Sequence, residues 1–310
     1  MNRTAKAGRF LGATVLVILC LCALAALTVA GLFRWVNRTN GELVSSGETR
    51  RYLLFVPSTY DPGTPTPLVI SLHGFVEWPA HQMQISGWND LAEESGFLVV
   101  YPEGTGVPRR WRAGGWASSA DPMIDVAFIS DLIDTLAQDY NIDPRRVYAN
   151  GLSNGGGMAY LLGCGLANRI AAIGGVAGAY AYPIDDCQPA RPVPMIAFHG
   201  TADAIVPYGG GDVQGPGVSL PSVPGWVAAW AALNGCDAVP SDLPARGEVS
   251  AIRYTGCDQG ADVEFYTIAG GGHTWPGGEP MPACIVGHTT RDLDATRAMW
   301  DFFRRFALQQ

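Results

Sequence analysis

Short apolar runs alternate with longer stretches of helical periodicity along most of this 310-residue chain. Several of the runs are apolar at nearly every position, as expected for parallel strands whose two faces are both covered. The predicted strands are residues 51–57, 67–74, 97–104, 145–151, 171–178, 193–200 and 263–270. This alternation predicts an α/β fold with a mostly parallel central sheet and helices on both faces. Functional groups in such sheets gather beyond the carboxyl ends of the strands.

The intervals between these strands show the periodicity of amphipathic or buried helices. Helices are predicted over four stretches: WNDLAEESG, VAFISDLIDTLAQDY, GGMAYLLGCGLAN and VPGWVAAWAALNG. A last predicted helix, LDATRAMWDFFRRFAL, carries a single apolar face. That face consists of Ala295, Met299, Phe302, Phe303 and Phe306.

The N-terminal segment is different in character. Arg3, Lys6 and Arg9 precede an uncharged run from Phe10 to Phe33. About 24 residues at a rise of about 1.5 Å span about 36 Å, more than a hydrocarbon core of about 30 Å. Small residues at the end of this run would also suit a signal peptidase. Residues 1–33 are therefore either a signal anchor or a cleaved signal peptide, and the basic flank predicts export of the rest.

The rest of the chain contains no repeat, charge run or low-complexity linker. We therefore expect one domain over residues 48–310, joined to the N-terminal segment by a short connecting stretch, residues 34–47, which is predicted to be a linker. The formal net charge of −8 argues against nucleic acid or an anionic membrane surface as the main partner. Contact with a membrane is expected only through residues 1–33, if they are retained.

Five cysteines follow the N-terminal segment, and cysteines of an exported protein can form disulfides. We expect the local pairs Cys164–Cys187 and Cys236–Cys257, which leaves Cys284 free. Sequence alone does not exclude other connectivities. The sequence contains neither a CxxC motif nor a histidine-rich cluster, so no motif indicates a metal site.

One serine occupies a distinctive position between a predicted strand and a predicted helix. The pentapeptide Gly151-Leu152-Ser153-Asn154-Gly155 has the G-x-S-x-G pattern of a nucleophile elbow. Side chains at either glycine position would collide with neighbouring backbone in such a turn, and the helix N-terminus would favour developing negative charge. For the pentapeptide alone, an ordinary glycine-rich turn is the alternative.

A nucleophilic serine requires a general base and a carboxylate that orients the base. His273 follows the last predicted strand in a loop of small residues, whereas His199 and His73 lie at strand ends, where packed histidines are common. Asp203 follows the strand 193–200, although an aspartate there could also simply cap a turn. The order Ser153, Asp203, His273, with each residue just beyond a strand, is that of the α/β-hydrolase fold.

The same architecture predicts an oxyanion hole made of two backbone N–H groups. One belongs to Asn154, which follows the nucleophile. The other comes from the loop LHGFVEW after the strand 67–74, and Phe75 is the expected donor. This chemistry requires no cofactor.

Six motifs of the sequence resemble those of a known family. The motifs LHG, YPEG, DPRRVYANGLSNGG, HGTADAIVPY, GGGHTWPGG and DATRAMWDFF occur in the order found in exported esterases of the polyhydroxybutyrate depolymerase-like and feruloyl esterase-like group, near carbohydrate esterase family one. The resemblance covers about residues 48–307. It implies a serine esterase with Ser153 as nucleophile, Asp203 as acid and His273 as base.

The sequence departs from the family pattern at two places. Family members often have further glycines after LHG, where this chain has Phe75-Val76-Glu77-Trp78. A methionine is common after SNGG, where this chain has Gly157. The first departure bears directly on the oxyanion loop and on the acyl pocket beside it.

The expected substrate is an ester attached to an extracellular polymer, with feruloyl or acetyl esters on plant polysaccharide ahead of polyhydroxybutyrate. Four tryptophans in predicted loops could line the acyl site, although ordinary packing is the alternative for each. They are Trp78, Trp111, Trp116 and Trp275. A serine peptidase and a non-catalytic surface-binding protein are the competing classes. The complete triad argues against the second, and the lack of a separate propeller or cap domain argues against an oligopeptidase.

Overall fold

The computed structural model describes residues 37–115, 121–213 and 218–309. The chain divides into a unit that ends at Arg38 and a unit of Thr39–Gln310, and the fold below is that of the second unit. The predicted signal segment 1–33 and Trp116 lie outside the described residues. Within the residues that are described, no helix has the length and apolar character needed to cross a membrane.

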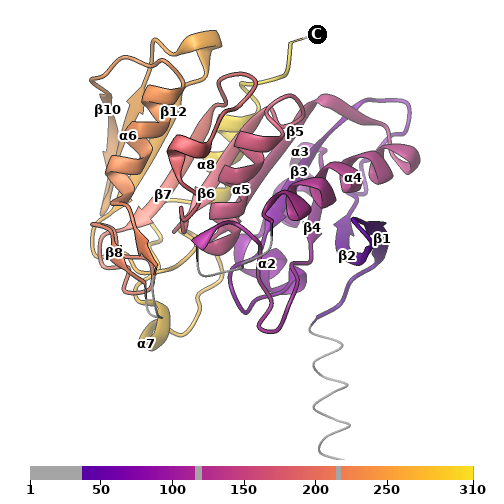
Figure 1. The fold of residues 1–310 in the computed structure, drawn as a ribbon, viewed down its shortest axis with the longest axis horizontal. Helices are drawn as coiled ribbons and strands as arrows, with labels where there is room; N and C mark the ends of the chain where they lie inside the picture. The colour runs from indigo at the N-terminus through magenta and orange to yellow at the C-terminus, as the bar shows by residue number, and fades with distance from the viewer. Residues whose placement is uncertain (1–36, 116–120, 214–217, 310) are drawn as a thin grey trace, which may run out of the picture. The chain divides into compact units, whose positions relative to one another are not determined.

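A ten-stranded sheet forms the centre of this unit, in the order β1-β2-β4-β3-β5-β6-β7-β12-β11-β10. The six strands from β4 to β12 in this order run parallel to one another (Figure 1). They are β4 (Leu98–Pro102), β3 (Thr66–Leu72), β5 (Ile142–Leu152), β6 (Ala172–Val176), β7 (Met195–Gly200) and β12 (Val263–Ile268). Antiparallel strands complete both edges: β1 (Gly41–Ser45), β2 (Glu48–Phe55), β10 (Ser241–Arg246) and β11 (Val249–Tyr254).

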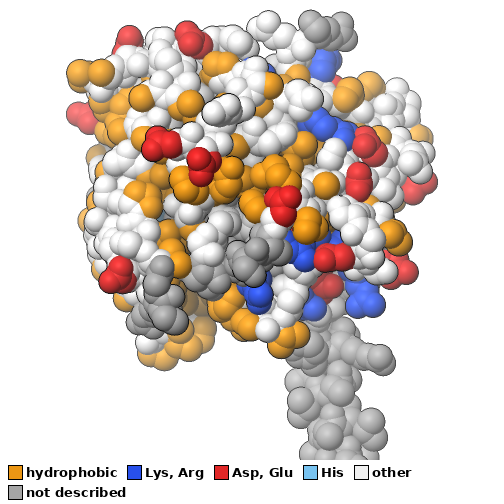
Figure 2. All heavy atoms as spheres, viewed as in Figure 1, with side chains coloured by type: hydrophobic (Ala, Val, Ile, Leu, Met, Phe, Trp, Pro, Cys, Tyr) orange, Lys and Arg blue, Asp and Glu red, His pale blue; other side chains and the backbone are white. Residues whose placement is uncertain are grey.

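Helices cover both faces of the sheet, and each face has its own hydrophobic core. One core is formed with α4 (Met123–Asp139), α5 (Asn154–Gly165) and α6 (Val223–Leu233). The other is formed with α2 (Pro79–Ser86), α3 (Trp88–Ser95) and α8 (Ala295–Phe303). Alternate residues of β5 enter opposite cores, Ala149 on the first side and Tyr148 on the second. Figure 2 shows the α4–α5–α6 face, on which acidic side chains are scattered among apolar ones, whereas the basic side chains lie on the side of α4.

All of the predicted strands and helices are present. On the last helix, Ala295, Met299, Phe302 and Phe303 are buried as predicted, and Phe306 is partly buried. Several elements were not predicted. They are α2, the short α7 (Ala283–Val286), the edge strands β1, β10 and β11, the small hairpin of β8 (Gly211–Asp212) and β9 (Ser219–Leu220), and two 3-10 turns, η2 (Ile184–Asp186) and η3 (Asp258–Gly260).

The structure corrects the expected domain boundary. Strand β1 lies inside the range 34–47 that was predicted to be a linker, and it pairs with β2 across a tight turn. Ser46 and Gly47 both have positive φ there, 50° and 77°, as a type I′ hairpin turn requires. The strand lacks an apolar run because it is an exposed edge, which explains why the hydrophobic pattern did not reveal it.

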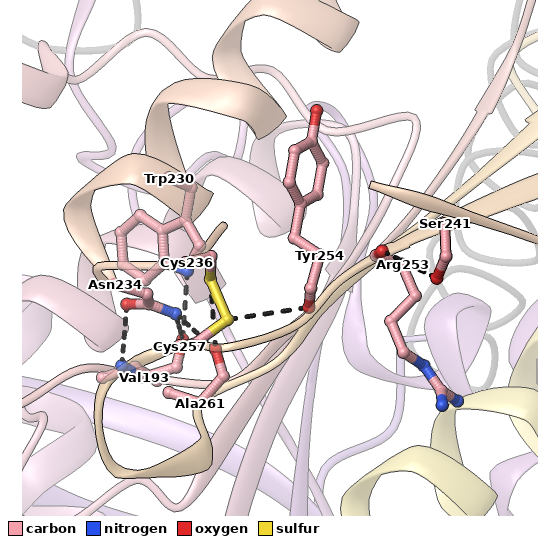
Figure 3. The surroundings of a disulfide bond; sticks show 9 residues. All are labelled: Val193, Trp230, Asn234, Cys236, Ser241, Arg253, Tyr254, Cys257 and Ala261. Carbon is pink, nitrogen blue, oxygen red and sulfur yellow. Dashed lines mark hydrogen bonds between the residues drawn. A yellow bond between two sulfur atoms is a disulfide. The ribbon is translucent and has the colours of Figure 1, made fainter. Parts of the chain in front are cut away.

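Both predicted disulfides are confirmed. Cys164–Cys187 joins α5 to the segment between β6 and β7, and Cys236–Cys257 joins the segment after α6 to the segment after β11. Cys284 is free and exposed. Figure 3 shows the second disulfide beside Asn234, whose side chain bonds to both backbone groups of Val193, so that this corner of the fold is tied together by covalent and polar links.

Candidate active site

The turn between β5 and α5 holds Ser153 in an unusual backbone conformation. Its φ of 57° and ψ of −119° lie in a region that L-residues rarely adopt. Three backbone hydrogen bonds maintain this geometry. The N–H of Ser153 donates to Val176 O at 2.9 Å, and its carbonyl accepts from the N–H groups of Gly157 and Ala179, each at 3.0 Å. Strain of this kind persists only where the surroundings fix it, and it commonly marks functional sites.

The two glycines of the pentapeptide are required by close backbone approach, as the sequence predicted. A Cβ atom at Gly151 would overlap the backbone of Gly155, and one at Gly155 would overlap the carbonyl of Leu72. Because Leu72 ends β3, this contact also shows that the strand before the predicted oxyanion loop passes directly against the turn of Ser153.

Asp203 and His273 are in direct contact. Nδ1 of His273 lies 2.8 Å from Oδ2 of Asp203, and both residues are buried, with 6% and 5% exposure. The other carboxylate oxygen, Oδ1, accepts from the N–H groups of Ile205 and Val206 at 2.9 and 2.8 Å. The aspartate is therefore fixed by its own turn, and it in turn fixes the orientation of the imidazole.

The surroundings of Asp203 favour its ionised form. Burial would raise the pKa of this carboxyl group, but the hydrogen bond and charge of His273, the proximity of His199 and the Val206 N–H outweigh it and lower the pKa below its usual value. His199 Nε2 lies 3.4 Å from Asp203 Oδ2 and 2.9 Å from Val206 O. An ionised Asp203 accepts the Nδ1–H of His273, which leaves Nε2 of that ring as the basic nitrogen.

The sheet places the three predicted residues at the same end of its parallel strands. β5, β6, β7 and β12 are consecutive parallel neighbours, so their carboxyl ends lie along the same side. Ser153, Asp203 and His273 each follow the carboxyl end of one of these strands. Backbone hydrogen bonds from Thr201 to Ile268 and from Ala202 to Gly271, both 2.9 Å, join the aspartate and histidine loops.

A hydrogen-bonded unit connects the nucleophile helix to the predicted oxyanion loop. The side chain of Asn154 accepts from Trp111 N–H at 2.7 Å and donates to Trp111 O at 3.2 Å. The indole N–H of Trp111 donates to His73 O at 2.9 Å. His73 Nδ1–H donates to Gly74 O at 2.7 Å, and Nε2 accepts from Gly104 N–H at 2.9 Å. Burial lowers the pKa of His73 to about 4, so this histidine is a neutral structural residue.

Comparisons with known proteins identify the family. Residues 51–184 match the family model described as esterase PHB depolymerase. A putative esterase, NocK, of Nocardia uniformis subsp. tsuyamanensis is 32% identical over 85% of this chain and 82% of its own length. The chain belongs to this esterase family. Feruloyl esterase D of Neurospora crassa is 27% identical over 94% of this chain and 97% of its own length. Feruloyl esterase B of Piromyces equi is 31% identical over 84% of this chain, which spans only 46% of that longer protein.

Solved structures confirm the α/β-hydrolase fold. A thermostable esterase matches with a TM-score of 0.56 at 16% identity, over 86% of this chain and 62% of its own. An acetyl xylan esterase from Aspergillus awamori matches with a TM-score of 0.54 at 17% identity, over 73% of this chain and 89% of its own. The family and its relatives show that the protein is a carboxylic ester hydrolase, as the sequence predicted.

Two of the four tryptophans predicted to line the acyl site of this esterase are buried. Trp111 and Trp275 are 0% and 1% exposed, so neither presents a face to a ligand. The indole N–H of Trp275 donates to Thr296 Oγ1 at 2.9 Å, which holds the histidine loop against α8. We therefore assign both residues to packing. Trp78 is partly exposed at the start of α2, with its ring 5.3 Å from that of His81, and it remains a candidate for substrate contact.

Sequence reasoning missed the polar groups that hold the loop after β3, the predicted oxyanion loop. Neither the pairing of Asn154 with Trp111 nor a contact of Glu77 with the loop backbone was expected. The only sequence signal was the replacement of family glycines by Phe75-Val76-Glu77. In the described parts of the chain, no group of three or more His, Cys, Asp or Glu side chains could hold a metal ion.

Proposed function

We propose that this esterase hydrolyses its substrate through an acyl-enzyme formed on Ser153. The observation that carries this proposal is the 2.8 Å contact between Asp203 and His273, at the sheet edge where Ser153 occupies a strained turn. In this mechanism Ser153 Oγ attacks the ester carbonyl while His273 Nε2 accepts its proton. His273 then protonates the leaving alcohol, and Asp203 stabilises the imidazolium.

The second half of the reaction reverses these roles. Water attacks the acyl-enzyme, His273 removes its proton, and Ser153 is released with the acid product. Both tetrahedral intermediates carry an oxyanion, which the N–H groups of Asn154 and Phe75 would stabilise. Each such donor contributes about 3–4 kcal/mol in comparable enzymes. The N-terminal end of α5 adds a favourable electrostatic field at the same place.

We further propose that the protein is exported and acts on feruloyl or acetyl esters of plant polysaccharide. The two disulfides are typical of an oxidising compartment, and the apolar segment 1–33 supplies an export signal or anchor. Support for the substrate comes from the names of relatives, which include feruloyl esterases and a bifunctional acetylxylan esterase/xylanase from Neocallimastix patriciarum. The description of the family model favours a second candidate, the polyester polyhydroxybutyrate.

Triad variants of the purified protein test the mechanism. Ser153→Ala and His273→Ala should each lower kcat for 4-nitrophenyl acetate by about 10⁴- to 10⁶-fold, and their losses should not add, because the residues act as one unit. Ser219→Ala, on an exposed strand, is the matched control and should match the wild type. Folded Ser153→Ala with wild-type turnover would eliminate the mechanism.

A substrate panel tests the second part of the proposal. Methyl ferulate, acetylated xylan, hydroxybutyrate oligomers and a peptide should be compared on the same preparation. We expect the highest kcat/KM on feruloyl or acetyl esters. Preference for hydroxybutyrate oligomers would establish the polyester alternative, and preference for the peptide would establish a peptidase.

A further inference from the structure

The oxyanion loop after β3 contains a tight turn from Gly74 to Glu77. The N–H of Glu77 donates to Gly74 O at 3.3 Å and closes the turn. Val76 has a φ of 65° and is 55% exposed, which is a rare conformation for a β-branched residue. Its N–H donates to Arg109 O at 2.8 Å. The turn therefore adopts a conformation that its own sequence does not favour, and neighbouring groups must hold it.

The side chain of Glu77 is the main such group. Its Oε2 accepts the N–H of Gly74 at 2.8 Å, so that the carboxylate bridges the first and last residues of the turn. A Cβ at position 74 would come within 2.9 Å of the same oxygen, so a side chain there would displace the carboxylate from this contact. On the other side of Gly74, its carbonyl accepts from His73 Nδ1–H. Both backbone groups of Gly74 are thus fixed by side chains.

Glu77 is well placed to make a strong hydrogen bond. Its side chain is only 17% exposed, and its second oxygen lies 3.5 Å from His81 Nδ1 on α2. Burial would raise the pKa of Glu77, but His81 and the Gly74 N–H outweigh burial and lower it. The carboxylate is therefore ionised, and hydrogen bonds to ionised acceptors are roughly twice as strong as neutral ones.

We propose that Glu77 is a positioning residue of the oxyanion hole, an inference that rests on the proposed serine mechanism. Its carboxylate engages the Gly74 N–H, and the turn that it closes sets the direction of the following N–H, that of Phe75. Gly74 also belongs to the unit that runs through His73 and Trp111 to Asn154. The carboxylate thereby fixes one oxyanion donor relative to the other. In this chain the Glu77 carboxylate holds a turn conformation that the residues of the turn do not themselves favour.

The test compares Glu77→Ala and Glu77→Gln with a matched control, Glu93→Ala. Glu93, on α3, makes the same kind of contact, with Oε2 accepting the Ser58 N–H at 2.9 Å, but Ser58 lies in the segment between β2 and β3 rather than in the loop after β3. Glu77→Ala should lower kcat by about 10- to 100-fold. This loss is smaller than that caused by removing an oxyanion-hole donor itself, which lowers kcat by about 10²- to 10³-fold. KM should change by less than about threefold, because ground-state binding does not use the oxyanion donors.

A boronic acid supplies a readout that a purely structural role would not change. Phenylboronic acid accepts the Ser153 oxygen at boron, the serine proton passes to His273, and the tetrahedral adduct places an oxygen in the oxyanion hole. Its Ki should rise in Glu77→Ala in proportion to the loss in kcat, whereas the Ki of the product acid should stay within about threefold. Glu77→Gln retains an amide oxygen as acceptor and should stay within about fivefold of wild type in both measures.

These outcomes distinguish a failure of the positioning role of Glu77 from a failure of the serine mechanism on which it rests. Glu77→Ala with the kcat and boronic acid Ki of Glu93→Ala would overturn the positioning role, as would equal weakening of boronic acid and product acid binding. If Glu77→Ala fails to fold, Glu77→Asp provides the same test, because its shorter carboxylate cannot make the same contact and Ki values are independent of the folded fraction. Failure of Ser153→Ala to abolish turnover and boronic acid binding would instead refute the serine mechanism itself.

Discussion

Acidification should destabilise this protein through two buried histidines, because burial lowers the pKa of both His199 and His73. The size of the effect can be worked out for His73. Its side chain is completely buried, and burial lowers its pKa to about 4 in the folded state, against about 6.5 in an unfolded chain. As the pH falls below about 6.5, the unfolded state takes up a proton that the folded state refuses. The stability associated with neutral His73 is therefore present above about pH 6.5 and is lost progressively down to about pH 4.

The size of this effect follows from the two pKa values. A difference of about 2.5 pH units corresponds to about 3.4 kcal/mol when the loss is complete, and the part lost between pH 7 and pH 5 is about 2 kcal/mol. That is a large fraction of the total stability of a typical domain, about 5–15 kcal/mol.

Urea unfolding at pH 7 and pH 5, with disulfides intact, measures this loss in the wild type and in His73→Gln. The variant should be less stable at pH 7, because Gly74 O and Gly104 N–H lose their partner. Its stability should nevertheless fall by about 2 kcal/mol less than that of the wild type between the two pH values, since the titrating group is gone. Identical pH dependence in both proteins would refute the assignment of a buried neutral imidazole.

Three further predictions concern other parts of the fold. Arg50, 2% exposed, contacts the fully buried Asp125 at 2.8 Å, and Arg112 contacts the same carboxylate at 2.9 Å, so Arg50→Met should lower the free energy of unfolding by about 1–3 kcal/mol; an unchanged free energy in urea unfolding would contradict this. Replacing Cys164 and Cys187 with serine should cost about 3 kcal/mol in the same assay, because the bridge closes a loop with a sequence separation of 23, and an unchanged midpoint would argue against it. Trp275→Phe should lower kcat/KM equally for methyl ferulate and 4-nitrophenyl acetate, because the buried indole supports the histidine loop; a selective loss on ferulate would restore the acyl-binding role.

The central sheet, and the placement of Ser153, Asp203 and His273 after the carboxyl ends of its strands, were accessible from the sequence because their signals are local. Parallel strands buried on both faces produce unbroken apolar runs, as in β3, where every residue is buried. The nucleophile turn needs glycines at fixed spacing, and the order of Ser153, Asp203 and His273 along the chain follows from the order of the strands. The disulfide pairs were predicted from export and short separation alone.

The features that the sequence did not reveal depend on contacts that no local pattern encodes. β10 has mostly exposed residues and a proline, so it carries no strand signal. Trp111 lies in a loop, which suggested exposure, yet it is fully buried, with its ring beside those of His73 and Phe128. The contact of Glu77 with Gly74 arises only once Val76 adopts positive φ, and a β-branched residue gives no reason to expect that conformation.

Covalent trapping of the nucleophile tests the central claim most directly. A fluorophosphonate ester reacts with an activated serine, releasing fluoride and leaving a stable phosphonyl group on the oxygen. Intact-protein mass spectrometry should show one label per chain with complete loss of esterase activity, and peptide mapping should place the label on Ser153. Ser153→Ala should take up none. Labelling of a different residue, or full activity in protein labelled at Ser153, would contradict the account.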